Sequence, residues 1–113
     1  MSINRERLAW AAGLFEGEGC VSGQRIAGTF YPKLSLGSTD PDVLVAFQLA
    51  IGGFGNITTK SRRGTKPHWK PAQQWQLTRF EHLQAVLAML WPWLKSRRRA
   101  RIKQVLTDYK GKK

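Results

Sequence analysis

Hydrophobic residues recur with a helical period in four segments of this chain and alternate with polar residues in the segments between them. A first helix is expected over 4–17, followed by extended segments at about 20–26 and 30–38. The second extended segment alternates most regularly, so its two faces should carry different residues. One face is expected to hold Phe30, Leu34 and Leu36, and the other Tyr31, Lys33 and Ser35.

A second helix is expected to start at Asp40, which can cap it, with Pro41 in its first position. Gly52-Gly53 should end this helix. A hairpin then follows, with one strand over 54–60 and the other over 69–78.

Two more helices are expected at the end of the chain, because Leu83 to Leu90 and Ile102 to Tyr109 hold apolar residues at helical spacing. Pro92 should separate them. The predicted order is α-β-β-α-β-β-α-α, an α+β fold in a single domain over 1–110, with 111–113 as a frayed tail.

The charge points to a polyanionic partner, because the 113 residues carry a formal net charge of +12. Nucleic acid is the first candidate and an acidic membrane surface the second. Cys20 is the single cysteine, which indicates a reducing compartment. We find no signal peptide and no apolar run long enough to span a bilayer, so an intracellular, soluble protein that is not secreted is expected.

The first helix ends with two acids, Glu16 and Glu18, and no base. Helix C-termini carry partial negative charge, so these acids call for a compensating cation, and a divalent metal is the leading candidate. Ala9, Gly13 and Gly17 leave one stripe of this helix almost without side chains. That stripe could pack closely against the protein's own sheet or against the same helix of a second copy.

The uncovered face of an antiparallel sheet is the predicted DNA-reading surface. By alternation it carries amide, hydroxyl and ammonium groups and no carboxylate, although a solvated sheet face is the plain alternative. These residues are Gln24, Lys33, Ser35, Asn56, Thr58, Lys60, Gln74 and Gln76.

Two basic clusters are expected to contact phosphates, which fix the position of a protein on DNA without reading sequence. The first cluster comprises Arg62, Arg63, Lys66 and Lys70, and a solubilising role is the alternative for it. The second comprises Arg97, Arg98, Arg99 and Arg101.

The segment Ala11-Ala12-Gly13-Leu14-Phe15-Glu16-Gly17-Glu18-Gly19 resembles the LAGLIDADG motif of homing endonucleases. The predicted order of elements resembles the core of that family, which has a saddle-shaped antiparallel sheet. Leu34-Ser35-Leu36 and Leu90-Trp91-Pro92-Trp93-Leu94-Lys95 are further local similarities.

The resemblance implies a site-specific endonuclease that cuts double-stranded DNA. It also implies a homodimer, because only one motif is present. It implies Mg²⁺ (or Mn²⁺) held by Glu18, with the carbonyl of Gly17 as a neighbouring ligand. The paired motif helices would meet through Ala9, Ala12, Gly13, Glu16 and Gly17. The sequence leaves open whether the gene lies in an intron, in an intein or by itself.

Further catalytic positions implied by the resemblance are Asp40, Lys95 and Arg97. Capping of a helix is the simpler role for Asp40. Arg97 stands where the family usually has Lys, and Arg cannot act as a base at neutral pH. Glu18 likewise stands in place of the more usual Asp. Glu16 is expected to cap or to hydrogen-bond at the helix crossing.

The same composition also fits two other functions. One is a non-cleaving nucleic-acid binder on the same fold, either an RNA maturase for intron splicing or a DNA-binding regulator. The other is a small basic ribosome-associated protein. A carboxylate at position 18 would give a pure binder no advantage against phosphates.

Overall fold

The computed structural model describes residues 4–59 and 72–110, and it shows the predicted α+β order. A short 3-10 turn, η1, separates the last two helices at the Pro92 position. The elements are α1 (Arg5–Glu18), β1 (Gly19–Ile26), β2 (Thr29–Ser38), α2 (Pro41–Ala50), β3 (Asn56–Thr59), β4 (Gln73–Leu77), α3 (Phe80–Leu90), η1 (Trp91–Trp93) and α4 (Ser96–Lys110).

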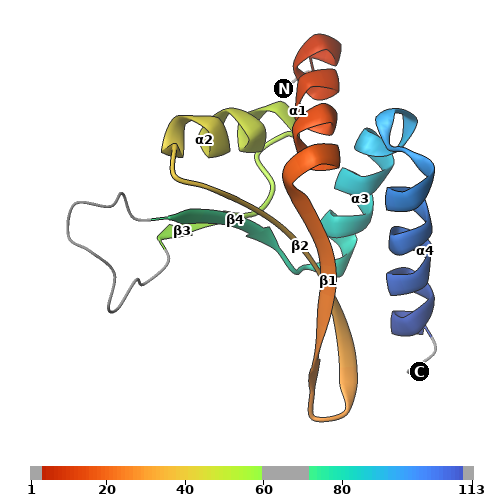
Figure 1. The fold of residues 1–113 in the computed structure, drawn as a ribbon. Coiled ribbons are helices and arrows are strands. Elements are labelled where there is room, and N and C mark those ends of the chain that lie inside the picture. The colour runs from red at the N-terminus through yellow and green to blue at the C-terminus, as the bar shows by residue number, and fades with distance from the viewer. Residues whose placement is uncertain (1–3, 60–71, 111–113) are drawn as a thin grey trace.

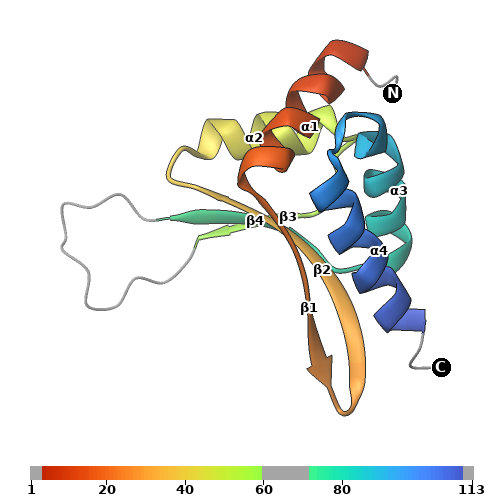
Figure 2. The same ribbon diagram turned by 45° about the vertical axis from the view of Figure 1, so that its right-hand side comes forward.

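The four strands form one antiparallel sheet in the order β1-β2-β4-β3. The helices gather on one side of this sheet, and the β1–β2 and β3–β4 hairpins run in different directions (Figures 1 and 2). No helix of the described residues lies on the opposite face of the curved sheet. This arrangement confirms the saddle-shaped antiparallel sheet that the resemblance implied.

The core lies between the helices and the covered face of the sheet, around three large aromatic residues. Phe47 stacks on Phe15 at 6.3 Å between ring centroids and meets Trp75 edge-on at 4.8 Å. The Trp75 indole N–H donates to the carbonyl of Phe54 at 2.8 Å. All three side chains are fully buried, so α1, α2 and β4 pack against one another at this point.

The N-termini of α1 and α2 are capped by side chains in the expected way. Asn4 accepts the Arg7 N–H at 3.0 Å and Asp40 accepts the Asp42 N–H at 2.9 Å, so each side chain satisfies a donor that a helix start leaves free. The prediction that Asp40 begins the second helix is confirmed.

Strand β3 begins two residues later than predicted. Gly52, Gly53 and Gly55 all have positive φ values of 90° to 96°, which are incompatible with an extended strand. The chain therefore turns until Asn56, and β4 likewise covers only Gln73–Leu77 of its predicted range. Positions 69–71 of that range lie outside the described residues.

Within the ranges that the structure describes, no helix combines the length and the apolarity needed to cross a membrane.

Candidate functional site

The uncovered face of the sheet follows directly from the strand register. Directly opposed residues of antiparallel strands share a face. Ser35 lies opposite both Cys20 and Gln76, and Gln76 lies opposite Asn56, so these four form a row across all four strands.

A second row on this outer face consists of Gly37, Gln74 and Thr58. Lys33 and Gln24 lie on the same face, opposite Ser22 and Tyr31. The structure thus brings together every predicted face residue except Lys60, which lies outside the described residues together with Arg62, Arg63, Lys66 and Lys70.

The outer face offers donors and acceptors without negative charge, because no Asp or Glu lies in the described strands. Amide, hydroxyl and ammonium groups match the edges of base pairs in a major groove. Ser35 requires a correction, since it is only 7% exposed and its hydroxyl is largely closed off from a ligand. DNA contact by the other residues stays a prediction.

The outer face also carries two residues that the predicted DNA-reading surface did not include. Tyr31 lies opposite Gln24, and Ile26 lies two residues beyond Gln24 on the same face. Their side chains are 41% and 54% exposed. Alternation had placed Tyr31 on the same face as Lys33 and Ser35, whereas Ile26 had been assigned to neither face. The predicted reading surface was defined by amide, hydroxyl and ammonium groups, so it included neither residue.

The two acids at the end of α1 have different surroundings. Glu16 accepts the Lys95 N–H at 2.7 Å, and its Oε2 lies 3.9 Å from Arg98 Nε. Glu18 is exposed, and no ion pair or hydrogen bond of its side chain is formed with another described residue. The cation beside Glu16 is therefore an arginine of the same chain, whereas the Glu18 carboxylate has no such partner within residues 4–59 and 72–110.

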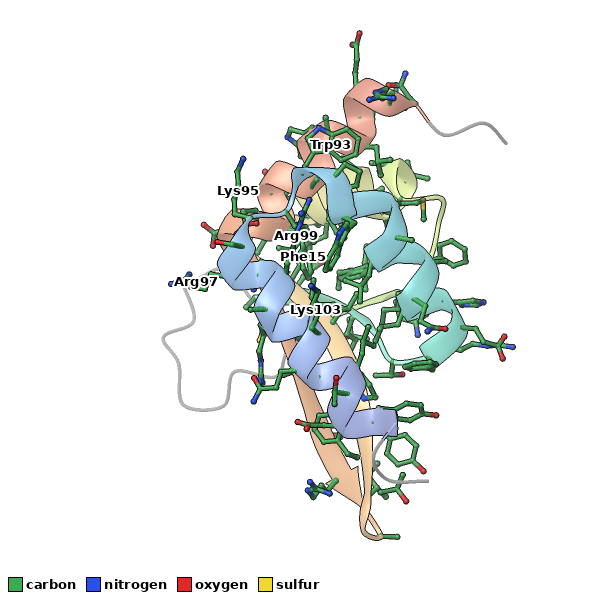
Figure 3. All side chains as sticks on the ribbon, turned by 90° about the vertical axis from the view of Figure 1, so that its right-hand side faces the viewer. Phe15, Trp93, Lys95, Arg97, Arg99 and Lys103 are labelled. Carbon is green, nitrogen blue, oxygen red and sulfur yellow. The ribbon has the colours of Figure 1, made fainter. Side chains whose placement is uncertain are left out.

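The contact of Glu16 with Lys95 brings the start of α4 beside the last turn of α1. Lys95 and Arg97 are exposed there (Figure 3). Two cations and the exposed carboxylate of Glu18 thus belong to neighbouring helix ends, although they come from opposite ends of the sequence. This juxtaposition suits a site that handles phosphate groups.

Oxygen atoms at the end of α1 fit a hard divalent cation. The last carbonyls of a helix have no partner within it. The Gly19 N–H donates to the Phe15 carbonyl, and Arg98 donates to the Glu16 carbonyl. The next carbonyl along the helix is that of Gly17. Within the described ranges, no three His, Cys, Asp or Glu side chains converge, so one chain would supply only part of such a coordination shell.

The small-residue stripe of α1 does not pack against the protein's own sheet. A Cβ atom added at Gly13 or at Gly17 would meet no atom within 4 Å. Ala9 is half-buried beside them, whereas Ala12 is fully buried in the core. The inclusion of Ala12 in a surface between two copies was therefore wrong, because this side chain faces inward.

Asp40 serves as the α2 cap, as the simpler interpretation had it. Its Oδ1 accepts the Asp42 N–H, and its own N–H donates to Ser38 Oγ at 3.0 Å. These contacts account for the residue structurally, and its catalytic role stays a prediction.

Arg98, Arg99 and Arg101 each donate to a backbone carbonyl of the same chain and so help to hold α4 in place, while phosphate contact by this cluster stays a prediction. Arg98 donates to the Glu16 carbonyl at 2.8 Å, and Arg99 donates to the Trp91 carbonyl at 2.8 Å. Arg101 donates to the Val21 carbonyl on β1 at 3.0 Å. Local crowding of arginines is thus relieved by carbonyl acceptors and aromatic rings of the same chain, with Arg98 lying over Phe15 and Arg99 over Trp91.

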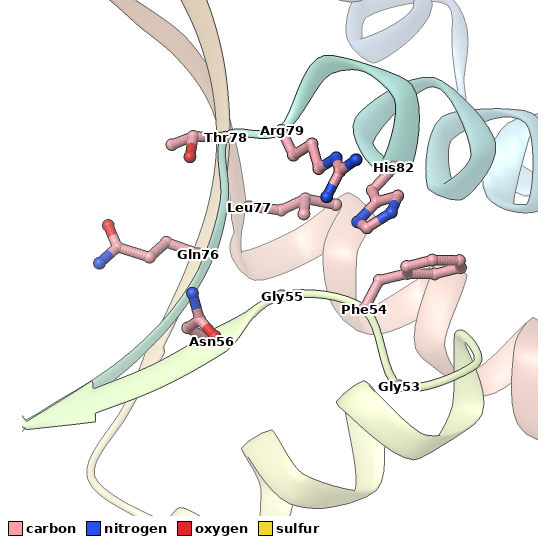
Figure 4. A pocket seen from close by; sticks show the side chains of 9 residues that line it. All are labelled: Gly53, Phe54, Gly55, Asn56, Gln76, Leu77, Thr78, Arg79 and His82. Carbon is pink, nitrogen blue, oxygen red and sulfur yellow. The ribbon is translucent and has the colours of Figure 1, made fainter.

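A cavity of about 350 Å³ lies between the start of β3 and the first turn of α3 (Figure 4). Arg79 and His82 line it from the α3 side, and Asn56 and Gln76 from the sheet. It does not include the end of α1. Its ring of polar groups is open to solvent and adds a basic flank to the outer face.

The family model of the LAGLIDADG-like domain matches residues 5–90 of this chain. A comparison with curated protein sequences found no match.

Solved structures of homing endonucleases share the fold. The chain is similar to I-CvuI in complex with its target, with 21% identity and a TM-score of 0.71, covering 91% of this chain and 65% of that one. It is similar to the LAGLIDADG meganuclease I-AabMI bound to uncleaved DNA, with 20% identity, a TM-score of 0.72, and coverage of 96% and 36%. It is also similar to the group I intron-encoded I-CeuI complexed with DNA, with 18% identity, a TM-score of 0.67, and coverage of 96% and 54%. The chain thus spans less than two thirds of the length of each.

Proposed function

Because this chain belongs to the LAGLIDADG-like domain family, whose model matches residues 5–90, we propose that it is a site-specific DNA endonuclease that depends on a divalent metal. In this proposal two copies act together on double-stranded DNA. Each copy places its outer sheet face in the major groove of one half-site.

The observation that carries the proposal is the position of Glu18. This exposed acid ends α1 immediately before β1, so it stands where the helical layer meets a sheet face without acidic residues. A carboxylate near phosphates is unfavourable for binding alone. It becomes useful when a cation lies between it and the phosphate.

Glu18 and the Gly17 carbonyl would hold the cation, which Mg²⁺ or Mn²⁺ can be. Mg²⁺ binds oxygen ligands, commonly one or two carboxylates together with substrate phosphates and water. When bound, such a cation activates water and stabilises the charge that develops on a leaving phosphate oxygen. The residues present fit this role, with the remaining ligands coming from DNA, from water and from the second copy.

Lys95 and Arg97 would support the same site from the start of α4. Both cations are exposed, and the Glu16 contact anchors the backbone of Lys95. Their part is to hold the phosphate in position and to balance its charge. Arg97 stays protonated throughout, so it cannot take the proton from water.

The pairing of two copies is proposed from the open stripe on α1. Gly13 and Gly17 leave room for another helix to approach closely, and no element of the described chain fills this space. Helices pack most closely through small residues. A second copy on this stripe would bring two Glu18 carboxylates together, one for each DNA strand.

The test is cleavage of a randomised duplex library by the full chain with Mg²⁺, with Mn²⁺ and with EDTA. We expect double-strand cuts at related, pseudo-palindromic sequences with metal and none with EDTA. Glu18→Gln should bind the selected DNA but not cut it. Glu81→Gln is the matched control, because Glu81 is also an exposed acid in a helix and lies on α3.

Unchanged cleavage by Glu18→Gln would overturn the role of this residue. Salt-sensitive binding without cleavage under any metal condition would instead identify a non-cleaving binder on the same fold.

A further inference from the structure

The tip of the β1–β2 hairpin projects beyond the four-stranded sheet. β4 pairs with β2 only from Leu34 onward, so Thr29–Lys33 pair with β1 alone. The turn consists of Ala27 and Gly28, with φ values of 52° and 84°, which favour a tight two-residue hairpin. A two-stranded ribbon of this kind is one of the two protein shapes that a DNA major groove admits.

The inner face of this ribbon is packed and therefore fixed in shape. A Cβ atom added at Gly23 would overlap the Phe30 ring, so the ring lies directly on the glycine backbone. The Arg25 guanidinium lies over the same ring at 5.7 Å from its centroid. The ribbon thus presents its outer face as a preformed surface.

That outer face carries an apolar patch formed by Ile26 and Tyr31. The two side chains line a shallow cavity of about 210 Å³, together with Gln24, Pro32, Lys33 and Thr78. Ile26 is 54% exposed and Tyr31 is 41% exposed, so neither contributes much to the core. Polar Gln24 and cationic Lys33 stand beside them on the same face.

We propose that Ile26 and Tyr31 read thymine methyl groups in the outer part of each DNA half-site. This inference rests on the proposed function. The C5-methyl group of thymine is the apolar feature of a major groove, and apolar side chains recognise it. No described helix contributes a residue to the cavity at this patch. The charge of the chain and the Lys33 ammonium favour a polyanion over an apolar protein partner.

The length of β1 predicts how far along the DNA the thymines should lie from the phosphate at Glu18. Seven residues separate Gly19 from Ile26, which at about 3.3 Å per residue is roughly 23 Å. At about 3.4 Å per base pair this distance corresponds to about seven base pairs. Thymine should therefore be enriched about seven base pairs outward from the phosphate that lies at Glu18, and not next to it.

The test compares two randomised duplex libraries, one made with thymidine and one in which deoxyuridine replaces every thymidine. Deoxyuridine lacks only the methyl group, so hydrogen bonding is unchanged. The full chain binds each library in Ca²⁺, and bound sequences are selected and titrated. We expect thymine at the outer positions, and binding about three- to five-fold weaker for each contacted methyl group that is lost.

The variant Ile26→Ser with Tyr31→Ser carries no methyl group at either position, so it should bind both libraries equally and lose the thymine preference. Both positions are exposed, so folding should persist, which circular dichroism checks. Val45→Ser is the matched control, because Val45 is a 45% exposed β-branched residue on α2. It should discriminate between the libraries as the native chain does.

Equal binding of both libraries by the native chain, with the usual salt sensitivity, would overturn this inference and leave the proposed function intact. A preference for thymine that survives in the double variant would also overturn it. Absence of salt-sensitive DNA binding would overturn both.

Discussion

The Glu16 carboxylate accepts the backbone N–H of Lys95 at 2.7 Å, which links the last turn of α1 to the residue before α4. The Lys95 carbonyl in turn accepts the Arg99 N–H at 2.9 Å, so Lys95 occupies the position that caps α4. Glu16 therefore acts as a cap supplied from a distant helix. The pair shows that the two acids of the motif have separate tasks.

Removal of the Glu16 carboxylate should destabilise the fold. Glu16→Ala leaves the Lys95 N–H without its acceptor and Arg98 without its ion pair, and we expect a loss of about 1–2 kcal/mol in the free energy of unfolding. Glu18→Gln should change it by less than about 0.5 kcal/mol, because Glu18 is exposed. Urea denaturation of both variants measures the difference. Equal losses would contradict the division of tasks.

A bulky residue in the α1 stripe should separate the two copies. Gly13→Leu places a large side chain in the space that a second helix would occupy, and a Cβ atom at this position has no contact with another element within 4 Å. We expect a monomer of unchanged fold in analytical ultracentrifugation. Ala85→Leu, an exposed helical position on α3, is the control and should leave the assembly as it is. A Gly13→Leu protein with the native sedimentation coefficient would contradict the proposed interface.

Two glycines with similar φ values should respond differently to a methyl group. Gly55→Ala and Gly28→Ala both force a side chain into the positive-φ region, at 91° and 84°. At Gly55 the new Cβ would also overlap the Trp75 indole, whereas at Gly28 it meets nothing. Gly55→Ala should therefore be more destabilising by about 1–3 kcal/mol. Thermal unfolding of the two variants tests the comparison.

DNA binding should weaken steeply with salt. If six to ten phosphates are neutralised, affinity falls about 10³- to 10⁵-fold between 50 and 200 mM salt. Arg97→Gln should reduce the slope of log K against log salt by about one, because Arg97 is exposed beside the proposed phosphate site. Arg7→Gln on the helical side should leave the slope unchanged. Fluorescence anisotropy with a labelled duplex measures both, and a flat salt response would contradict DNA binding.

Local patterns were sufficient for the order of elements and for the division of the sheet into two faces. Alternation along β2 separated Leu34 and Leu36 from Lys33, and the observed register confirms that separation. The Asp40-Pro41 start of α2 was likewise visible, because capping depends on residues that are neighbours in sequence. Each of these features arises from contacts within a few residues.

The surroundings of the arginines in α4 were not predictable in the same way. Charge density indicated phosphate contacts for Arg98 and Arg99, but each guanidinium has a carbonyl acceptor in the same chain. The burial of Ala12 was also hidden, since Ala suits a helix surface as well as a core. The burial of a side chain and the acceptors of a guanidinium depend on which helices pack against each other in the folded chain.

The sequence by itself determined the α+β order, the basic character and the motif that ends α1, because period, composition and capping act over short stretches of chain. Only the tertiary structure decided which partners the Glu16 carboxylate has. Glu16 and Lys95 are 79 residues apart, and their contact exists because the sheet and the core hold α1 and α4 together. It also decided that the tip of the β1–β2 hairpin projects with Ile26 and Tyr31 uncovered, since this depends on where β4 stops pairing with β2.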